Sequence, residues 1–352
     1  MAFKTATVQT GKVVSTQSNF PVYVDLDRLG ITTLAEAQSV RVYADEAKTT
    51  EWAREIVSVT EMHVKVPSLT STVEIFVDWD GVRADYAVSA TYGRNAVWSD
   101  YSGVYHLNED PSGGAGAVID STGNYPATSG GSMTSGDVIT GAFGGGTKGT
   151  AMSFDGDDFL DTNDGSALLP GTSDNTLTMW FKYPSTASSV IYGSYRSSDG
   201  MSQQLSIFSG KMGDYYRSSA GSYKTRVSAT TINSGTWYKI KTNWDYSAKT
   251  INIYLNGSLD QAGGYLYNAG TVGNITSTLD TYIGKRNLNG GVDAIAVIED
   301  EVRIKKNSLD SAEWEETEYN NQNDEATFWG TWTDAGGGGA AQSARRGAVM
   351  MM

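Results

Sequence analysis

The amino-acid sequence predicts an all-β protein built from long antiparallel strands. Apolar and polar residues alternate along residues 176–182 and again along residues 236–245, which in a strand places the large side chains on one buried face. Asn256 and Gly257 end a third alternating segment, and both tolerate the positive φ angles of a tight hairpin turn. The composition agrees, because 40 glycines, 20 tyrosines and 9 tryptophans with only 6 prolines are typical of aromatic strands joined by turns.

The chain of 352 residues is long enough for two domains, each with its own core. We expect a small β-sandwich-like domain over residues 1–101 that serves attachment. Its strands are predicted at residues 20–26, 39–44, 63–67 and 72–79, with a short helical turn at residues 34–38.

The second predicted domain covers residues 102–330 and is a larger jelly-roll β-sandwich with long glycine-rich loops. A short C-terminal helix is predicted over residues 308–319, where Ser308 or Asp310 is the expected N-cap. Residues 331–352 form a predicted flexible tail, because four consecutive glycines at 336–339 have no capacity for a core. The alternative for this tail is docking of Arg345, Arg346 and the final methionines into a partner subunit.

Charge and cysteine content narrow the function classes. A formal net charge of −14 disfavours nucleic acid and anionic membranes as partners, and no apolar segment is long enough for a transmembrane helix. The chain has no cysteine, which excludes disulfides and thiolate catalysis. The first residues lack the apolar stretch of a secretory signal, so we expect release by lysis or within a particle.

Catalysis is not predicted. His63 and His106 are the only histidines and lie far apart in sequence, which disfavours a Ser-His-Asp site or a histidine-rich zinc site. We expect a surface imidazole at His63 and a structural hydrogen bond at His106. Glu299, Asp300 and Glu301 are adjacent, so a strand would send neighbours to opposite faces rather than into one hydrolytic cleft. The prediction is a protein that is not an enzyme.

Six sequence pieces in order resemble one family. They are Gly103–Leu107, Asp120–Asn124, Gly149–Phe159, Leu177–Trp180 with Trp237 and Tyr238, Ile253–Gly257, and Tyr282–Gly284. This order resembles the laminin-G-like group of concanavalin-A-like lectin domains, in its bacterial and phage branch. The first domain resembles the small uncharacterised β-domain that often precedes such a lectin-like domain, on the pieces Phe20–Val22, Ser39–Tyr43 and Val64–Pro67. The resemblance covers residues 20–328. With it, the missing export signal, the missing cysteine, the glycine-rich loops and the short tail indicate a bacteriophage virion surface protein.

The resemblance implies one structural calcium ion near the edge of the sandwich. Its ligands would be Asp120, Asn124 and either Asp293 or Asp300. The last ligand has two candidates because residues 291–293 and residues 298–304 both resemble the family's motif. Calcium requires six to eight oxygen ligands, so converging carboxylates have the right chemistry. Asp155, Asp157 and Asp158 are an alternative acidic cluster or a solvated turn.

Tyrosines in Gly/Ser-rich surroundings are candidates for a carbohydrate platform, because the apolar C–H faces of sugars pack on aromatic rings. Trp180, Trp237 and Trp244 are expected in the core instead. Tyr265, Tyr267, Lys224 and Arg226 are further members of the tyrosine and arginine group. The main candidates are Tyr192, Tyr195, Arg196, Tyr215, Tyr216, Arg217 and Tyr223.

The resulting hypothesis is a non-enzymatic phage virion surface protein, such as a head fibre, decoration or tail-associated protein. Its lectin-like domain would recognise a host cell-surface glycan, and its other partners would be virion proteins, with a homo-oligomer compatible with this setting. Its location would be the virion surface, or outside the cell after lysis. The alternatives are a purely structural virion component, because fold does not fix function, or a glycan-active enzyme or adhesin module.

Overall fold

The computed structural model describes residues 2–184, 189–195, 202–219, 221–275, 279–285 and 296–336. The chain divides into two compact units, one comprising Met1–Val97 with Glu325–Met352 and the other comprising Trp98–Asp324. The structure therefore divides the chain differently from the boundaries expected at residues 101 and 330. The second unit is an insertion in the sequence of the first.

The first unit contains a five-stranded antiparallel sheet in the order β24-β1-β7-β3-β4 and a three-stranded sheet in the order β2-β6-β5. Its strands are β1 (Ala2–Thr7), β2 (Gln17–Asp25), β3 (Arg41–Tyr43), β4 (Glu51–Trp52), β5 (Arg54–Ile56), β6 (Glu61–Leu69), β7 (Glu74–Trp79) and β24 (Thr333–Asp334). Its helices are α1 (Leu34–Gln38), α2 (Arg94–Val97) and α5 (Glu325–Trp329), with a 3₁₀ turn at Leu26–Leu29. Thr33 and Glu36 form a capping box that fixes the start of α1, where the sequence predicted a helical turn.

The C-terminal segment is an integral part of this first unit. The Arg28 guanidinium donates a hydrogen bond to the Glu325 carboxylate at 2.6 Å and another to the Gly330 carbonyl. Trp329 is fully buried, and its indole N–H donates to the Tyr23 carbonyl at 3.2 Å. Strand β24 then pairs with β1. The predicted tail therefore begins as ordered structure, and residues 337–352 lie outside the described residues.

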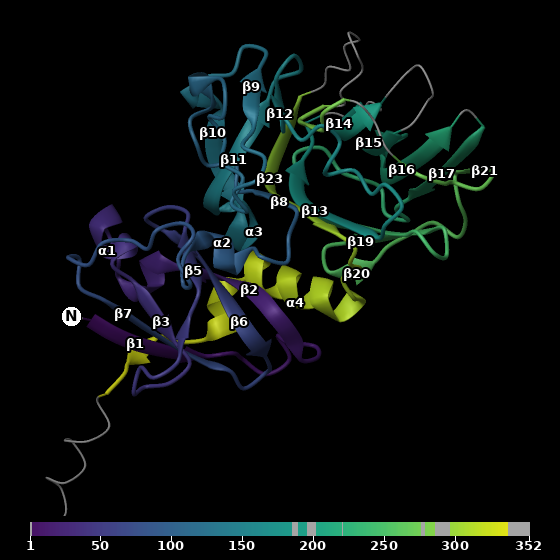
Figure 1. Ribbon diagram of the computed structural model, residues 1–352. Helices are drawn as coiled ribbons and strands as arrows, with labels where there is room; N and C mark the ends of the chain where they lie inside the picture. The colour runs from purple at the N-terminus through teal and green to yellow at the C-terminus, as the bar shows by residue number, and fades with distance from the viewer. Residues whose placement is uncertain are drawn as a thin grey trace, which may run out of the picture. The chain divides into compact units, whose positions relative to one another are not determined.

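The second unit is built from two eight-stranded antiparallel sheets (Figure 1). The first sheet has the order β10-β11-β23-β13-β18-β19-β20, with β8 also paired to β23, and the second has the order β21-β17-β16-β15-β14-β22-β12-β9. The strands of the first sheet are β8 (Gly103–Tyr105), β10 (Val138–Ala142), β11 (Lys148–Phe154), β13 (Asn175–Lys182), β18 (Trp237–Asp245), β19 (Thr250–Leu255), β20 (Ser258–Leu259) and β23 (Val297–Lys306). Those of the second are β9 (Thr128–Gly130), β12 (Phe159–Asp161), β14 (Ser189–Tyr195), β15 (Ser202–Phe208), β16 (Lys211–Ser219), β17 (Ser222–Val227), β21 (Tyr267–Ala269) and β22 (Tyr282–Ile283).

One hydrophobic core joins the two sheets of this unit. Leu177, Met179 and Phe181 alternate along β13 and point into the core, as the period-two pattern predicts. Tyr216 of the second sheet stacks on Trp244 of the first with ring centroids 4.6 Å apart. The hairpin turn predicted at Asn256 and Gly257 joins β19 to β20, and both residues have positive φ. The predicted all-β class with a sandwich and a short C-terminal helix is confirmed.

Helix α4 (Ala312–Asn323) covers the outer face of the first sheet. This is the face to which alternation directs those side chains of β13, β18 and β23 that do not point into the core. Its N-cap is Ser311, next to the expected Asp310. Trp180 is buried here rather than in the inter-sheet core: its indole N–H donates to Gln322 at 2.7 Å, and its ring stacks on Tyr319. The unit also contains α3 (Phe143–Gly146) and two 3₁₀ turns at Pro111–Gly113 and Ser135–Asp137.

The contact between α4 and the sheet is made largely by buried charges. Lys239 of β18 contacts Glu315 at 2.6 Å and Glu318 at 2.7 Å, and Arg303 of β23 contacts Glu318 at 2.6 Å. All four side chains are almost completely inaccessible to solvent. Within the described residues, no helix has the length and apolar character needed to span a bilayer.

Candidate functional site

Strands β16, β17 and β21 lie next to one another at the β21 end of the second sheet of the second unit (Figure 1). Each carries one tyrosine on the outer side of the sheet. We call Tyr215, Tyr223 and Tyr267 the tyrosine face. They come from β16, β17 and β21, and both neighbouring ring pairs have centroids 6.2 Å apart. Tyr267 retains 50% of its accessible surface, and the other two are half-buried. The face therefore offers a row of aromatic surface to solvent.

Strand alternation separates the predicted tyrosines into two groups. Tyr216 lies next to Tyr215 in β16 and so points to the opposite side, into the core, where it is fully buried. Tyr192 of β14 is also fully buried in that core, and burial raises the pKa of both phenols well above the ordinary value. The prediction that Tyr192 and Tyr216 contact carbohydrate is therefore wrong, since neither ring reaches the surface.

Polar side chains accompany the tyrosine face. Arg217 is the cross-strand partner of Tyr223 and is partly exposed on the same side of the sheet. Gln204 of β15 is the cross-strand partner of Tyr215. Alternation with the core residues Leu205 and Ile207 places Gln204 on the outer side of the sheet, but its side chain is buried, so Arg217 is the accessible polar neighbour. The side chain of Tyr195 and the whole of Arg196 lie outside the described residues.

Asp120, the main predicted calcium ligand, is buried and fully engaged by hydrogen bonds. Its carboxylate accepts from the backbone N–H of Val104 at 2.9 Å, from the backbone N–H of Tyr125 at 2.9 Å and from the Thr122 hydroxyl at 2.6 Å. The backbone N–H groups of Thr122 and Asn124 also donate to it. Five donors fill the lone pairs that a cation would need. Asp120 therefore fits a turn anchor and does not fit a calcium ligand.

The other predicted ligands do not complete such a site. The Asn124 side-chain amide donates to the Thr122 hydroxyl at 2.9 Å. Asp300 is buried and accepts from the backbone N–H of Ala142 at 2.8 Å, so it is bonded to a different segment from that which holds Asp120. Asp293 lies outside the described residues. The described candidate ligands therefore give no converging set of oxygens for calcium.

The three carboxylates of the alternative acidic cluster do lie close together, and the buried one is hydrogen-bonded to the backbone. Carboxylate oxygens of Asp155, Asp157 and Asp158 lie within 4.8 Å of one another. Asp158 is buried and accepts from the backbone N–H of Ser132 at 2.9 Å and of Asp155 at 3.2 Å. Asp155 and Asp157 are exposed. These contacts are those of a turn stabilised by one buried carboxylate.

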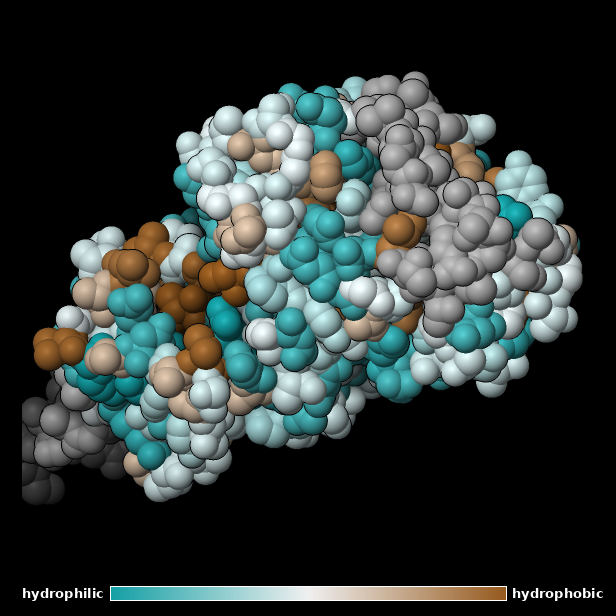
Figure 2. Space-filling view, turned by 45° about the horizontal axis from the view of Figure 1, so that its top comes forward, coloured by the Kyte–Doolittle hydropathy of each residue, from teal (hydrophilic) through white to brown (hydrophobic). Residues whose placement is uncertain are grey.

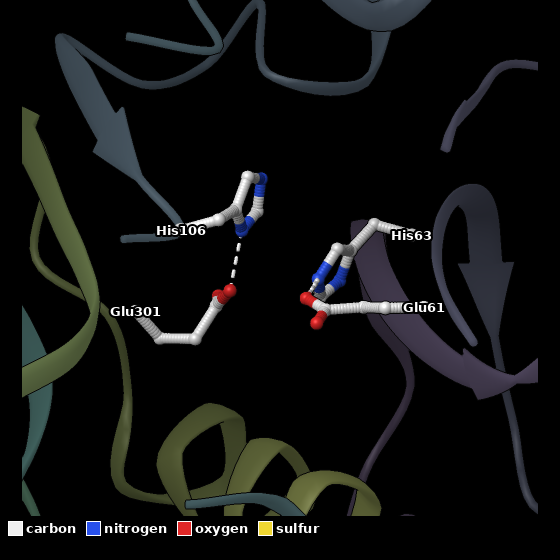
Figure 3. A group of neighbouring side chains, drawn as sticks. All are labelled: Glu61, His63, His106 and Glu301. Carbon is white, nitrogen blue, oxygen red and sulfur yellow. Dashed lines mark hydrogen bonds and ion pairs between the residues drawn. The ribbon is translucent and has the colours of Figure 1, made fainter. Parts of the chain in front are cut away.

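Each of the two histidines pairs with a glutamate of its own unit (Figure 3). In the first unit, the His63 ring nitrogen Nε2 lies 3.1 Å from the Glu61 carboxylate. In the second unit, His106 Nδ1 contacts the Glu301 carboxylate, which also accepts from Arg303. The structural hydrogen bond predicted for His106 is present. The surface position predicted for His63 is wrong, because the imidazole is completely buried.

The acidic triplet at the middle of β23 separates as its adjacency predicts. Glu299 lies opposite Met152 and Phe181, both of them core residues. Burial raises the pKa of the Glu299 carboxyl well above its usual range. Asp300 binds the Ala142 backbone, and Glu301, at φ 54°, joins the Arg303 network. The three carboxyls therefore serve three separate structural environments.

Comparison with known proteins identifies a segment of the second unit. Residues 154–313 match the family model described as the concanavalin A-like lectin/glucanases superfamily. This segment is a concanavalin A-like lectin/glucanase domain. The predicted family resemblance is thereby confirmed for these residues. No curated protein sequence matches the chain.

Several solved structures are similar to part of this chain. The botulinum neurotoxin type G receptor-binding domain is 18% identical, with a TM-score of 0.42, over 62% of this chain and 51% of that chain. The botulinum neurotoxin serotype D ligand-binding domain in complex with N-acetylneuraminic acid is 16% identical, with a TM-score of 0.43, over 65% and 53%. The binding domain of Paraclostridial Mosquitocidal Protein 1 is 13% identical, with a TM-score of 0.42, over 62% and 51%. The chain thus spans about half the length of these structures.

Proposed function

We propose that this protein binds carbohydrate through the tyrosine face of its lectin-like domain and performs no catalysis. The observation that carries the proposal is the row of Tyr215, Tyr223 and Tyr267 on one outer sheet face. The family match to the lectin/glucanase superfamily supports a saccharide as the ligand.

The chemistry of the face suits sugar rings. A pyranose has one apolar C–H face, which packs against an aromatic ring while the hydroxyl groups bond to nearby polar side chains. The exposed Tyr267 supplies the most accessible ring, and the partly exposed Arg217 brings hydrogen-bonding groups to the same side. Rings that are already packed against one another lose little conformational freedom on binding.

A role without catalysis is supported by the positions of the acidic side chains. Glycoside hydrolysis uses two carboxyls on either side of the scissile bond. No acidic residue is among the cross-strand partners that β16, β17 and β21 provide for the tyrosine face. These partners are Thr225, Arg217 and Ala269. The acidic triplet of β23 belongs to the other sheet and is buried.

The setting that we propose is the surface of a bacteriophage particle, where the glycan would be on the host cell and the neighbours would be virion proteins. A chain without cysteine supports assembly in a reducing cytoplasm before use outside the cell. Display in many copies would convert weak binding at each tyrosine face into useful avidity. Mass spectrometry of gradient-purified particles from producing cells tests the setting, and absence of the chain from intact particles would contradict it.

The experiment that tests the binding function is a bacterial-glycan array probed with the full chain and with a Tyr223→Ala/Tyr267→Ala variant. We expect the variant to lose at least about tenfold in affinity, because buried aromatic contacts dominate such interfaces. Tyr92→Ala, a half-buried tyrosine of the first unit, is the matched control and should bind like the wild type. Array signals that are equal for the wild type and the double variant would contradict the tyrosine face as the site. A folded wild type that binds no glycan would favour a structural role.

A further inference from the structure

Three cationic side chains gather around two tyrosines where β17 packs near the β18–β19 turn of the lectin-like unit. Lys224 and Arg226 both lie over the Tyr265 ring, at 4.9 Å and 4.3 Å from its centroid. The ammonium of Lys224 donates to the backbone carbonyl of Lys249, whose own ammonium lies 2.9 Å from the Tyr246 ring centroid. We call Lys224, Arg226 and Lys249 the cationic cluster.

The strand order explains why these cations converge. In β17, Lys224 and Arg226 alternate with Tyr223 and Thr225, so the cations point to the opposite side from the tyrosine face. Both cations remain partly exposed. Tyr265 is held in place, because its hydroxyl accepts a hydrogen bond from the Ile251 backbone at 3.2 Å.

None of the three cations forms an ion pair with a carboxylate of the described residues. Elsewhere in the unit, Lys239, Arg303 and Lys305 contact carboxylates within 3 Å, whereas the buried Lys241 donates to backbone carbonyls instead. The cluster differs in bringing three cations without carboxylate contacts together. The Arg226 Nε atom is buried and has no hydrogen-bond partner among the described residues. In a chain with a net charge of −14, three clustered cations without carboxylate partners are an unbalanced local charge.

The carboxylates nearest in sequence or register form no ion pair with the cluster, although Asp245 attracts Lys249 electrostatically at longer range. Asp245, in the same turn as Lys249, accepts from the Ala248 backbone at 2.8 Å and from the Ser247 hydroxyl at 2.8 Å. Asp214 is the cross-strand partner of Arg226 but is completely buried in the core. Cation–π contacts orient the ammonium and guanidinium groups without neutralising them. The cluster therefore keeps its positive charge available for an external anion.

We propose that the cationic cluster is an anion-binding subsite that receives the carboxylate or sulfate groups of an acidic polysaccharide. This rests on the proposed function, because it names acidic glycans as the class that the lectin-like unit recognises. Strand β17 would then contribute both kinds of contact, aromatic from Tyr223 and cationic from Lys224 and Arg226. Guanidinium and ammonium groups together suit polyanions, since arginine binds oxyanions through a planar fork and lysine as a point charge.

The test compares dextran sulfate with unsulfated dextran of the same length, with binding to the full chain measured by calorimetry at low and at high salt. We expect dextran sulfate to bind and dextran to bind at least about tenfold more weakly, with the difference falling as salt screens the charges. Lys224→Gln/Arg226→Gln/Lys249→Gln should lose at least about tenfold in affinity for dextran sulfate, since each exposed ion pair contributes a modest amount. Lys4→Gln/Lys12→Gln/Lys182→Gln removes the same charge outside the cluster and should retain binding.

The outcomes separate this inference from the proposed function. Equal loss in the cluster variant and in the charge-matched control would overturn it, because net charge alone would then explain the binding. A wild type that does not bind dextran sulfate at low salt would also overturn it. Binding of neutral glycans that depends on Tyr223 and Tyr267 could stand in either case, and circular dichroism of the cluster variant shows that it is folded.

Discussion

The buried charges beneath α4 give a prediction in which two adjacent glutamates behave differently. Glu318 forms ion pairs with both Lys239 and Arg303, whereas Glu315 pairs directly with Lys239 alone among the described cations and interacts with Lys241 at longer range. We therefore expect Glu318→Gln to destabilise the protein strongly and Glu315→Gln to have a small effect. Both substitutions keep the size of the side chain, so the comparison isolates charge.

The magnitude follows from the pKa of each carboxyl. Lys239 and Arg303 outweigh burial and lower the pKa of Glu318 from 4.5 to about 2. At about 1.4 kcal/mol for each pKa unit, neutralising this group costs about 3 kcal/mol of unfolding free energy at neutral pH. Loss of one partner from a buried ion pair typically costs a similar amount, about 3–5 kcal/mol. Burial raises the pKa of Glu315, so its ionised form stabilises the fold little, and its neutralisation should cost less than about 1 kcal/mol.

The assay is urea unfolding of the full chain, followed by tryptophan fluorescence at several pH values. Because the pKa of Glu318 is lower in the folded state, its contribution is complete above about pH 4.5 and is lost as the pH falls toward 2. The difference between the wild type and Glu318→Gln should shrink over that interval. Equal costs for the two variants at pH 7, or a Glu318→Gln cost below about 1 kcal/mol, would refute the assigned roles.

Three further predictions concern a buried carboxyl, the predicted calcium ion and the C-terminal segment of the first unit. Burial raises the pKa of Asp214 to about 7, so this carboxyl should contribute a loss of about 4 kcal/mol of stability as the pH rises from about 4 to 7. In urea titrations, the stability of Asp214→Asn relative to the wild type should rise by that amount over the interval. A chelator should leave the melting temperature unchanged in calorimetry, because the Asp120 oxygens are occupied by five donors; a fall of several degrees would contradict this. Trp329→Ala should destabilise the first unit by about 3–5 kcal/mol in thermal unfolding, and an unchanged melting curve would show that the C-terminal segment is dispensable.

The spacing of apolar residues along the sequence predicted those elements in which one face is buried along the whole element. The alternation along β13 and β18, the hairpin at Asn256 and Gly257, and the helical turn at residues 34–38 all follow from local side-chain spacing. The outer position of Trp180 was not predictable in this way, because alternation gives two faces without saying which one a helix will cover. Helix α4 contacts the sheet through lysine, arginine and glutamate, which single-sequence reading places at the surface.

The site was predicted in part for the same reason. Glycine- and serine-rich surroundings pointed to the strands that carry the tyrosine face, but composition treats Tyr215 and Tyr216 alike, and only the register decides that one faces outward. Lys249 was missed because its partners Lys224 and Arg226 are more than twenty residues away in sequence and meet it only through the packing of β17 near a turn. Asp120 was assigned to a metal because an acidic turn motif has the same residues whether its carboxylate binds backbone N–H groups or a cation.

The return of the chain to the first unit bears on how the lectin-like unit can be studied. Residues 98–324 form a unit with its own core, so this segment has the internal contacts needed to fold alone. The first unit differs, because it takes a strand and a buried tryptophan from beyond residue 324. A fragment that ends at residue 324 would leave Tyr23 and Arg28 without their partners Trp329 and Glu325. Binding measured on residues 98–324 would therefore isolate the tyrosine face and the cationic cluster, whereas residues 1–97 alone would be a damaged first unit and an unsuitable control.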